Sequence, residues 1–219
     1  MTSADESPGP LDILARAREL PPLVTAVAHP CDPPSLEATL VARDHGLIDP
    51  ILIGPRDKIL GAAESAGLEL AGVIIDSVPH SHAAAARAVE LVRRAEAQAI
   101  MKGSLHTDEL MSEVVKAESG LRTARRISHV FVMQVPALDR LLLVTDGAVN
   151  IEPSLEVKAD IVRNAIDLAR ALGIPQPRVA ILSAVETVTS KLRSTLDAAA
   201  LCKMAERGQI EGGILDGPL

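Results

Sequence analysis

Short apolar runs rich in β-branched residues alternate along the whole chain with longer amphipathic stretches. We expect strands at residues 23–28, 51–53, 73–75, 99–101, 129–133, 141–145, 179–183 and 213–215. We expect helices at residues 35–45, 81–94, 107–117, 155–172 and 195–207, several of which end before a glycine. Strands that alternate with helices in this way are typical of an α/β fold, in which helices cover a largely parallel sheet.

The composition fits a soluble protein of this fold class. The 219 residues are 47% apolar, which is enough for a substantial core. No apolar run is long enough to cross a bilayer, and residues 1–10 are polar and acidic. We therefore expect a cytoplasmic protein with a disordered N-terminus at residues 1–10. Cys31 and Cys202 match no disulfide or zinc pattern, so we expect two free thiols and no bound metal.

Charge and aromatic content restrict the partners. Acidic residues outnumber basic ones by 29 to 22, and Phe131 is the only aromatic residue besides histidine. Single-stranded nucleic acids are bound by basic grooves and aromatic stacking, so the composition argues against a nucleic-acid partner. An anionic substrate would need locally positive potential. Candidate cations for that purpose are Lys102, Arg122, Arg125, Arg126, Lys158, Arg163 and Lys191.

Residues 101–110, MKGSLHTDEL, have the chemistry of an anion site. Lys102 directly follows an expected strand and supplies a positive charge, and Gly103 would let the backbone approach a ligand. Thr107 is placed to cap the next helix, whose free N–H groups would face the loop. A phosphate group fits such a loop, and a solvated loop lysine is the alternative interpretation.

Two more segments place polar residues at the ends of expected strands, namely GLRTARRISH at 120–129 and TDGAVNIEP at 145–153. Ligands of open α/β sheets bind outside the carboxyl ends of the strands. Lys102, Asp146 and Ser183 each follow an expected strand at that end, so one shared cleft is predicted. Further along, Ser194 with Asp197 three residues later resembles a capping box for the last helix.

Five segments, in this order and at matching spacing, resemble the phosphate acetyltransferase and phosphate butyryltransferase family: MKGSLHTDEL, GLRTARRISHVFVM, TDGAVNIEP, ILSAVETV and ILDGPL. The resemblance covers residues 20–219 and is closest to the transferase half of bacterial fusions with a MaoC-type enoyl-CoA hydratase. It implies an isopropylmalate-dehydrogenase-like architecture, with two α/β/α domains and a cleft between them. Residues 11–133 would form the first domain, and residues 134–219 would form an incomplete second domain.

The resemblance also implies a reaction. Such enzymes convert acyl-CoA and phosphate into acyl phosphate and coenzyme A, and for this chain we expect a short acyl group, acetyl or butyryl. The transfer would be a direct attack in a ternary complex, with coenzyme A as a substrate and with no metal or redox cofactor. A homodimer or higher homo-oligomer is expected.

Site residues follow from the same resemblance. Asp146 and Asn150 would act in catalysis or substrate positioning, although a turn is an equal alternative for their segment. The guanidinium of Arg122 could hold a phosphoryl group through two hydrogen bonds. His129 could instead be a structural histidine, and Lys191 a surface residue. The full set of expected substrate-binding residues is Lys102, Gly103, Ser104, Thr107, Arg122, Ser128, His129, Lys191, Asp216 and Gly217.

Members of the resembling family continue past a Gly-Pro-Leu like that at 217–219, with a segment that carries their proposed general base, an aspartate. We therefore expect the 219-residue chain by itself to be inactive or nearly so. Two alternatives stay open from the sequence. The chain could be a truncated or ligand-binding remnant of the family, or a metal-dependent dehydrogenase of the same fold.

Overall fold

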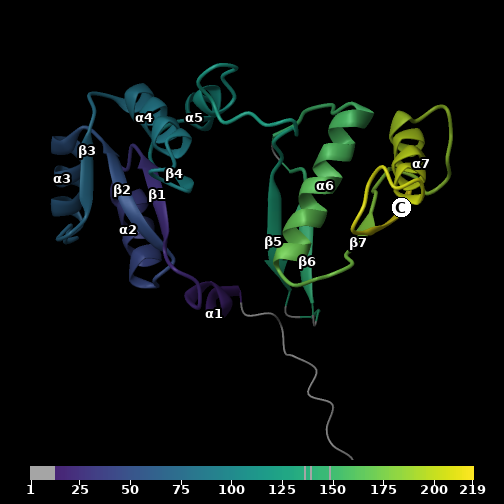
Figure 1. The fold of residues 1–219 in the computed structure, drawn as a ribbon, viewed down its shortest axis with the longest axis horizontal. Helices are drawn as coiled ribbons and strands as arrows, with labels where there is room; N and C mark the ends of the chain where they lie inside the picture. Colours follow the sequence, from purple (N-terminus) through teal and green to yellow (C-terminus); the bar gives the residue numbers. More distant parts are fainter. Residues whose placement is uncertain (1–12, 136, 139, 148) are drawn as a thin grey trace, which may run out of the picture. The chain divides into compact units, whose positions relative to one another are not determined.

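The computed structural model describes residues 13–135, 137–138, 140–147 and 149–219. The chain forms two compact units, an N-terminal unit of residues 12–123 and a C-terminal unit built mainly of residues 124–219 (Figure 1). The expected disordered N-terminus, residues 1–10, lies outside the described residues. No helix in the described part of the chain has the length and apolar character needed to cross a membrane.

A parallel four-stranded sheet forms the centre of the N-terminal unit. Its strands are β1 (Leu23–Ala28), β2 (Ile48–Gly54), β3 (Ile74–Ser77) and β4 (Ala99–Lys102), in the order β3-β2-β1-β4. All neighbouring strands are parallel, and Ala28 at the end of β1 lies opposite both Ile53 and Lys102. The loops after β1 and β4 therefore leave the sheet side by side.

Helices cover both faces of this sheet. The short α1 (Ile13–Arg18) precedes β1, while α2 (Pro33–Asp44) and α3 (Arg56–Ser65) pack on the face to which Val27 points. The helices α4 (Ser81–Arg93) and α5 (Thr107–Val114) pack on the other face, against Ala26 and Ala28. Fully buried alanines in α4, among them Ala84 and Ala88, let this helix lie close to the sheet. The unit is a three-layer α/β/α sandwich.

The C-terminal unit has a different sheet arrangement. Strands β5 (Val130–Gln134) and β6 (Leu141–Thr145) form an antiparallel pair, and β7 (Arg178–Ala180) and β8 (Ile214–Asp216) form a parallel pair. Helix α6 (Leu155–Ala171) runs beside the first pair, and α7 (Arg193–Glu206) packs near the second (Figure 1). Buried Ile166 of α6 and Leu201 of α7 belong to one core cluster, which also includes Val179 and Leu215.

Three features differ from the sequence-based expectations. The division between the units falls after Thr123 rather than after Met133, because β5 pairs along its whole length with β6. The parallel sheet is confirmed for the N-terminal unit, whereas the C-terminal unit has two separate pairs of strands. The expected capping box is wrong: α7 starts at Arg193 after Leu192, which makes no side-chain capping bond. Asp197 instead pairs with Lys158 of α6.

Candidate functional site

The loops that follow β1 and β4 are joined by backbone hydrogen bonds. The N–H of Gly103 donates to the carbonyl of Ala28 over 2.9 Å, and the N–H of Ser104 donates to the carbonyl of His29 over 2.9 Å. A Cβ at Gly103 would lie 2.6 Å from the His29 oxygen and 2.7 Å from the Ala28 oxygen. The glycine is therefore needed for the close approach of two loops, whereas the sequence suggested close approach to a ligand.

Lys102 holds its own loop together and still presents a charge. Its Nζ donates to the carbonyl of Gly103 over 3.1 Å and to the carbonyl of Leu105 over 2.9 Å. An ammonium group has three N–H bonds, so one donor remains for a ligand. Lys102 is exposed at the carboxyl end of β4, which fits an anion-binding role better than a solvated lysine without contacts.

The start of α5 is less favourable to an anion than the sequence suggested. His106 occupies the N-cap position without a side-chain hydrogen bond, and Thr107 is the first helical residue, so the expected cap at Thr107 is wrong. Asp108 and Glu109 stand in the first turn. Their carboxylates favour the helix start but would repel a phosphate at its N–H groups. Glu109 is largely buried, with Oε1 lying 2.6 Å from Nδ1 of His82.

Arg122 lies near the end of the N-terminal unit. The backbone before it is fixed by a hydrogen bond of 2.7 Å from the N–H of Leu121 to the carbonyl of Val114. The Arg122 side chain is exposed, and the described part of the chain offers it no hydrogen bond or ion pair. Its five N–H donors are thus available to a ligand.

In the C-terminal unit, Asp146 organises the segment that follows β6. Its carboxylate accepts hydrogen bonds from the N–H of His129 over 2.9 Å, from the N–H of Asn150 over 3.0 Å and from the side-chain amide of Asn150 over 2.6 Å. Partial burial alone would raise the pKa of Asp146. The donated hydrogen bonds together outweigh that effect, so the pKa of this carboxyl group lies below its ordinary value of 3.8.

The lowered pKa of Asp146 implies that the free energy of unfolding depends on pH in the acid range. A group with a lowered folded-state pKa stabilises the native state above its unfolded pKa, and this contribution is lost as the pH falls through the folded pKa. Unfolding monitored between pH 6 and roughly pH 2 should show the wild type losing more stability than Asp146→Asn. If the unfolding free energies of the two proteins changed equally with pH, the pKa of Asp146 would not be lowered by folding.

Asn150 uses both ends of its side-chain amide. Besides its bond to Asp146, the amide nitrogen donates to the carbonyl of Ile127 over 2.9 Å, and the amide oxygen accepts from Nε of Arg126 over 2.9 Å. The nearby His129 ring packs edge-on against Phe131, with ring centroids 4.3 Å apart. Its buried Nδ1 has no hydrogen-bond partner in the described residues.

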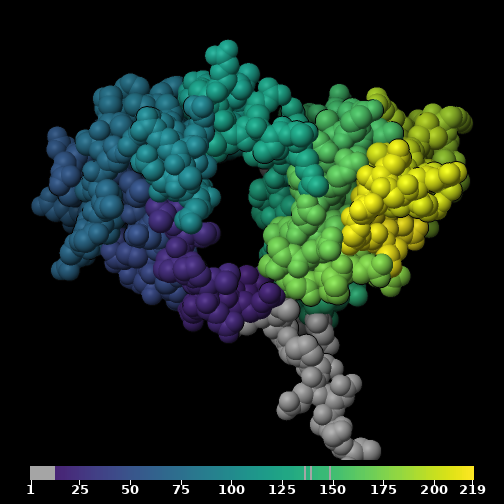
Figure 2. Space-filling model, in the orientation of Figure 1, coloured from purple at the N-terminus to yellow at the C-terminus, as the bar shows by residue number. Residues whose placement is uncertain are grey.

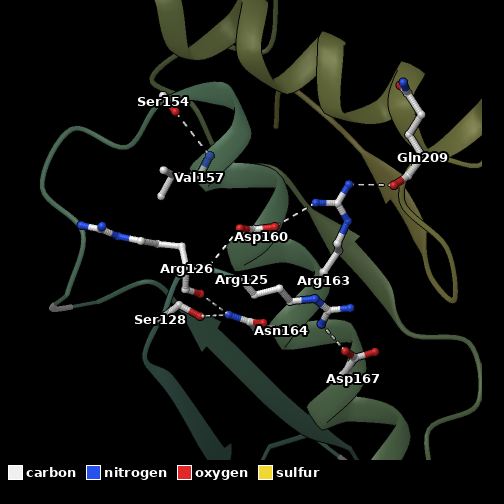
Figure 3. A network of polar contacts seen from close by, with 10 residues as sticks. All are labelled: Arg125, Arg126, Ser128, Ser154, Val157, Asp160, Arg163, Asn164, Asp167 and Gln209. Atoms are coloured by element: carbon white, nitrogen blue, oxygen red, sulfur yellow. Dashed lines mark hydrogen bonds and ion pairs between the residues drawn. The ribbon is translucent and has the colours of Figure 1, made fainter. Parts of the chain in front are cut away.

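The segment before β5 is held against α6 by polar contacts (Figure 3). Arg125 forms an ion pair with Asp167, and the N–H of Arg126 donates to Asp160 over 3.0 Å. The side-chain amide of Asn164 donates to the Ser128 hydroxyl over 2.9 Å and also to the carbonyl of Arg126 over 2.9 Å. Arg125 therefore has a structural partner, which argues against a main role in binding an anionic substrate.

The loops after β7 and β8 lie together in the C-terminal unit. The Asp216 carboxylate accepts from the N–H of Gly217 over 3.0 Å. Leu219 exchanges backbone hydrogen bonds with Ile181 and Ser183, and the last part of the chain, in yellow, lies at the surface (Figure 2). The Ser183 hydroxyl lies 2.7 Å from the Ser194 hydroxyl.

The structure thus places some of the expected site residues in two hydrogen-bonded networks and leaves the others outside them. Ser128, His129, Asp146 and Asn150 share one hydrogen-bonded network, and Lys102, Gly103 and Ser104 share another. Thr107 follows that second group at the start of α5. Arg122 and Lys191 are exposed side chains outside both networks, and Asp216 and Gly217 form a turn of their own. In the described residues, no group of three or more His, Cys, Asp or Glu side chains is arranged to hold a metal ion.

His29, which the sequence did not single out as a site residue, lies at the carboxyl edge of the parallel sheet. His29 contacts Ser104 through Nδ1 at 3.2 Å, although 75 residues separate the two in sequence. The available signal was the position of His29 directly after an expected strand. Its partner depends on the adjacency of β1 and β4, which local sequence patterns do not specify.

The fold and these loops define an α/β protein with polar groups gathered at the carboxyl edge of a parallel sheet. The chain belongs to the "Phosphate acetyl/butaryl transferase" family, whose model matches residues 80–219.

Similar proteins support this membership. Phosphate acetyltransferase of Rhizobium meliloti is 60% identical over 207 residues, covering 94% of this chain and 66% of the relative. Phosphate acetyltransferase of Rickettsia felis is 54% identical, covering 95% of this chain and 60% of the relative. Phosphate butyryltransferase of Clostridium acetobutylicum is 43% identical, covering 93% and 67%. The chain spans less than two thirds of the length of the first two.

Solved structures agree with the fold. A branched-chain phosphotransacylase from Enterococcus faecalis V583 superimposes with a TM-score of 0.74 at 26% identity, covering 90% of this chain and 68% of the other. A phosphotransacetylase from Streptococcus pyogenes gives a TM-score of 0.74 at 17% identity, covering 94% and 71%. The second likeness is evidence for the fold alone.

Proposed function

We propose that this protein is a phosphate acyltransferase that interconverts acyl-CoA plus phosphate and acyl phosphate plus coenzyme A. The observation that carries the proposal is family membership, supported by 60% identity to a phosphate acetyltransferase over 94% of the chain. The acyl group is short, acetyl or butyryl, because relatives named for both match the chain. Direct attack in a ternary complex is the proposed route, and the two units are proposed to be the two domains of an isopropylmalate-dehydrogenase-like architecture.

The reaction has three physical requirements. The coenzyme A thiol, with an ordinary pKa of about 8.5, must lose its proton before it attacks an acyl phosphate. The carbonyl oxygen of the acyl group gains negative charge and needs hydrogen-bond donors, and the departing phosphate needs cations. Metal and redox chemistry are not among these requirements, so we propose that no such cofactor is used.

Two free cysteines are consistent with a proposed cytoplasmic location.

We propose that two cationic side chains, Lys102 and Arg122, bind the phosphate. Lys102 has one N–H left for a ligand, and Arg122 offers an unpaired guanidinium. Asp146 is a weak base because its pKa is lowered, so its proposed role is to fix Asn150 and the backbone of His129. The remaining proposed substrate contacts are Gly103, Ser104, Thr107, Ser128, His129, Lys191, Asp216 and Gly217.

Removal of either cation should weaken phosphate binding. Lys102→Ala and Arg122→Ala each remove a charge-assisted contact of about 1.5 to 3 kcal/mol, which corresponds to a rise of roughly tenfold to a hundredfold in the Michaelis constant for phosphate. The exposed Arg207 of the α7 C-terminus provides a control of equal charge, and Arg207→Ala should leave that constant unchanged. Equal phosphate saturation curves for all three variants and the wild type would contradict the assignment.

We also propose self-association through the hairpin of β5 and β6. Phe131, Met133, Leu142 and Val144 lie on one face and are 42 to 52% exposed, with Phe131 opposite Val144 and Met133 opposite Leu142. These four side chains carry no charge, so they can meet their copies across a two-fold axis without like-charge repulsion. The second copy of this chain is therefore the proposed occupant.

Sedimentation tests this surface. Leu142→Lys combined with Val144→Lys should convert an oligomer into a smaller species, because a two-fold contact would bring the new charges together. Leu60→Lys, which changes an exposed leucine of α3, is the control and should not change the mass. An oligomer of unchanged mass in the double variant would exclude the hairpin as the contact.

The proposed activity is tested with the whole product of the gene that encodes these residues. Acetyl-CoA or butyryl-CoA should release coenzyme A in proportion to added phosphate, and a metal chelator should not reduce the rate. A requirement for a nicotinamide cofactor and a divalent metal would overturn the proposal in favour of a dehydrogenase. Binding of coenzyme A without any turnover would favour a ligand-binding remnant of the family.

A further inference from the structure

Three hydrogen bonds fix Arg126 in place. Its backbone N–H donates to the Asp160 carboxylate over 3.0 Å, and its carbonyl accepts from the side-chain amide of Asn164 over 2.9 Å, so α6 holds the backbone through both peptide groups. Its side-chain Nε donates to Oδ1 of Asn150 over 2.9 Å. An exposed arginine normally samples many rotamers, whereas these contacts restrict both the backbone of Arg126 and the plane of its guanidinium.

The orientation of Asn150 is fixed in turn. Its side-chain nitrogen donates to the Asp146 carboxylate over 2.6 Å and to the carbonyl of Ile127 over 2.9 Å, and its backbone N–H donates to Asp146 over 3.0 Å. A carboxylate and a carbonyl can only accept, so the nitrogen of the amide must face them and the amide oxygen must face Arg126. Asp146 therefore sets the direction of the guanidinium through Asn150.

The two terminal nitrogens of Arg126 remain for a ligand. Neither makes a hydrogen bond or ion pair with a described residue, and the side chain is exposed. Figure 3 shows this side chain extending away from α6, while Arg125 and Arg163 pair with Asp167 and Asp160 of that helix. The free N–H groups form a planar fork that matches two oxygens of a phosphate group. Because the fork is already oriented, binding would cost little further conformational entropy.

An exposed apolar side chain follows Asn150 in sequence. Ile151 is 93% exposed, and its backbone is held between the fixed Asn150 and Ser154, which accepts from the N–H of Val157 and so caps α6. Covering such a side chain with another apolar surface would be favourable. The phosphates of coenzyme A are joined to adenosine, whose base has an apolar face, whereas inorganic phosphate has none. This combination of groups therefore favours the nucleotide end of coenzyme A over inorganic phosphate.

We propose that Arg126 binds a phosphate group of coenzyme A, in an orientation set by Asn150 and Asp146. The proposal rests on the phosphate acyltransferase function given above, and it leaves inorganic phosphate and the phosphoryl group of acyl phosphate to Lys102 and Arg122. Coenzyme A carries a diphosphate and a 3′-phosphate, and the guanidinium fork fits either group. Arg126 is thus a substrate-binding residue, whereas Asn150 and Asp146 are positioning residues.

Three thiol substrates separate the phosphate groups of coenzyme A. With acyl phosphate as the second substrate, Arg126→Ala should raise the Michaelis constant for coenzyme A by roughly tenfold to a hundredfold and leave that for acyl phosphate within about twofold. Pantetheine, which has no phosphate, should give the same constant in the variant and the wild type. With dephospho-coenzyme A, a raised constant would assign Arg126 to the diphosphate and an unchanged one to the 3′-phosphate. Arg207→Ala, at the exposed C-cap of α7, is the control of equal charge and should change none of these constants.

Two further variants test the orientation of the guanidinium. Arg126→Lys keeps the charge but lacks the planar fork and the hydrogen bond to Asn150, so it should recover only part of the affinity for coenzyme A. Asn150→Ala should raise the Michaelis constant for coenzyme A in the wild-type background and raise it little further when combined with Arg126→Ala. Full recovery in Arg126→Lys, or equal effects of Asn150→Ala in both backgrounds, would overturn the positioning role of Asn150.

The failure of this assignment differs from the failure of the proposed function. In an active enzyme, an unchanged Michaelis constant for coenzyme A in Arg126→Ala, or an equal rise with pantetheine, would overturn the role of Arg126. A rise for acyl phosphate alone would also overturn it. No turnover by the wild type would overturn the acyltransferase function, and calorimetric titration of coenzyme A into the wild type and Arg126→Ala would then decide the assignment: weaker binding by the variant supports it, and equal or absent binding contradicts it.

Discussion

Gly103→Ala should destabilise the protein by about 1 to 3 kcal/mol, the cost of forcing an extra carbon into a filled space. The new Cβ would lie 2.6 and 2.7 Å from two backbone oxygens, and backbone atoms cannot move aside as a flexible side chain can. The loops after β1 and β4 would have to separate. Because Lys102 ends β4 directly before one of these loops, the proposed activity should fall as well.

Urea unfolding measures the effect, and the chain contains an informative control. Gly61 lies within α3 with no atom near the position of an added Cβ. Gly61→Ala should therefore stabilise the protein by up to about 1 kcal/mol, through the better helix propensity of alanine. The same substitution is thus expected to have opposite signs at the two positions. A neutral or stabilising effect at Gly103 would show that the two loops do not need to lie so close.

Lys158→Met should cost about 3 to 5 kcal/mol of unfolding free energy, the usual effect of leaving a buried charge without its partner. Nζ of Lys158 lies 2.6 Å from Oδ2 of Asp197, whose side chain is only 10% exposed. Arg193 lies 3.7 Å from the same oxygen, but its side chain is 76% exposed and can compensate little. The pair joins α6 to α7, so its loss should loosen the core of the C-terminal unit.

Two further variants separate this mechanism from a general effect of lysine removal. Lys158→Met combined with Asp197→Leu should recover most of the lost stability, because the buried carboxylate is removed as well. Lys203→Met, which breaks an exposed pair with Glu206 on α7, should cost less than about 1 kcal/mol. Equal losses for Lys158→Met and Lys203→Met would contradict the account of a buried pair.

The strands and helices were largely predictable because their patterns are local. The expected strands at 23–28 and 141–145 coincide with β1 and β6, and the expected helix at 155–172 differs from α6 by one residue. Helix α3 was not predicted, and the boundary between the units was placed too late because β5 was separated from its partner β6. Pairing between strands is a tertiary property that periodicity does not specify.

The site was predictable in part. The sequence correctly placed polar loops after β4 and β6, because ligand-binding groups of α/β proteins follow strands. It did not predict what these groups contact. Ser194 and Asp197 matched a local capping pattern, yet each has a tertiary partner, Ser183 and Lys158. The sequence predicted a close approach of Gly103 to a ligand and did not show its close approach to another loop. A local motif indicates where chemistry is possible, whereas partners distant in sequence determine its use.

The most direct measurement is phosphorus NMR of the gene's whole product with butyryl-CoA or acetyl-CoA and inorganic phosphate. We predict a new acyl phosphate signal that grows at the rate of coenzyme A release, in the presence of a chelator and without a nicotinamide cofactor. Release of coenzyme A with no acyl phosphate would indicate hydrolysis of the thioester and would contradict the central claim that phosphate is the acyl acceptor.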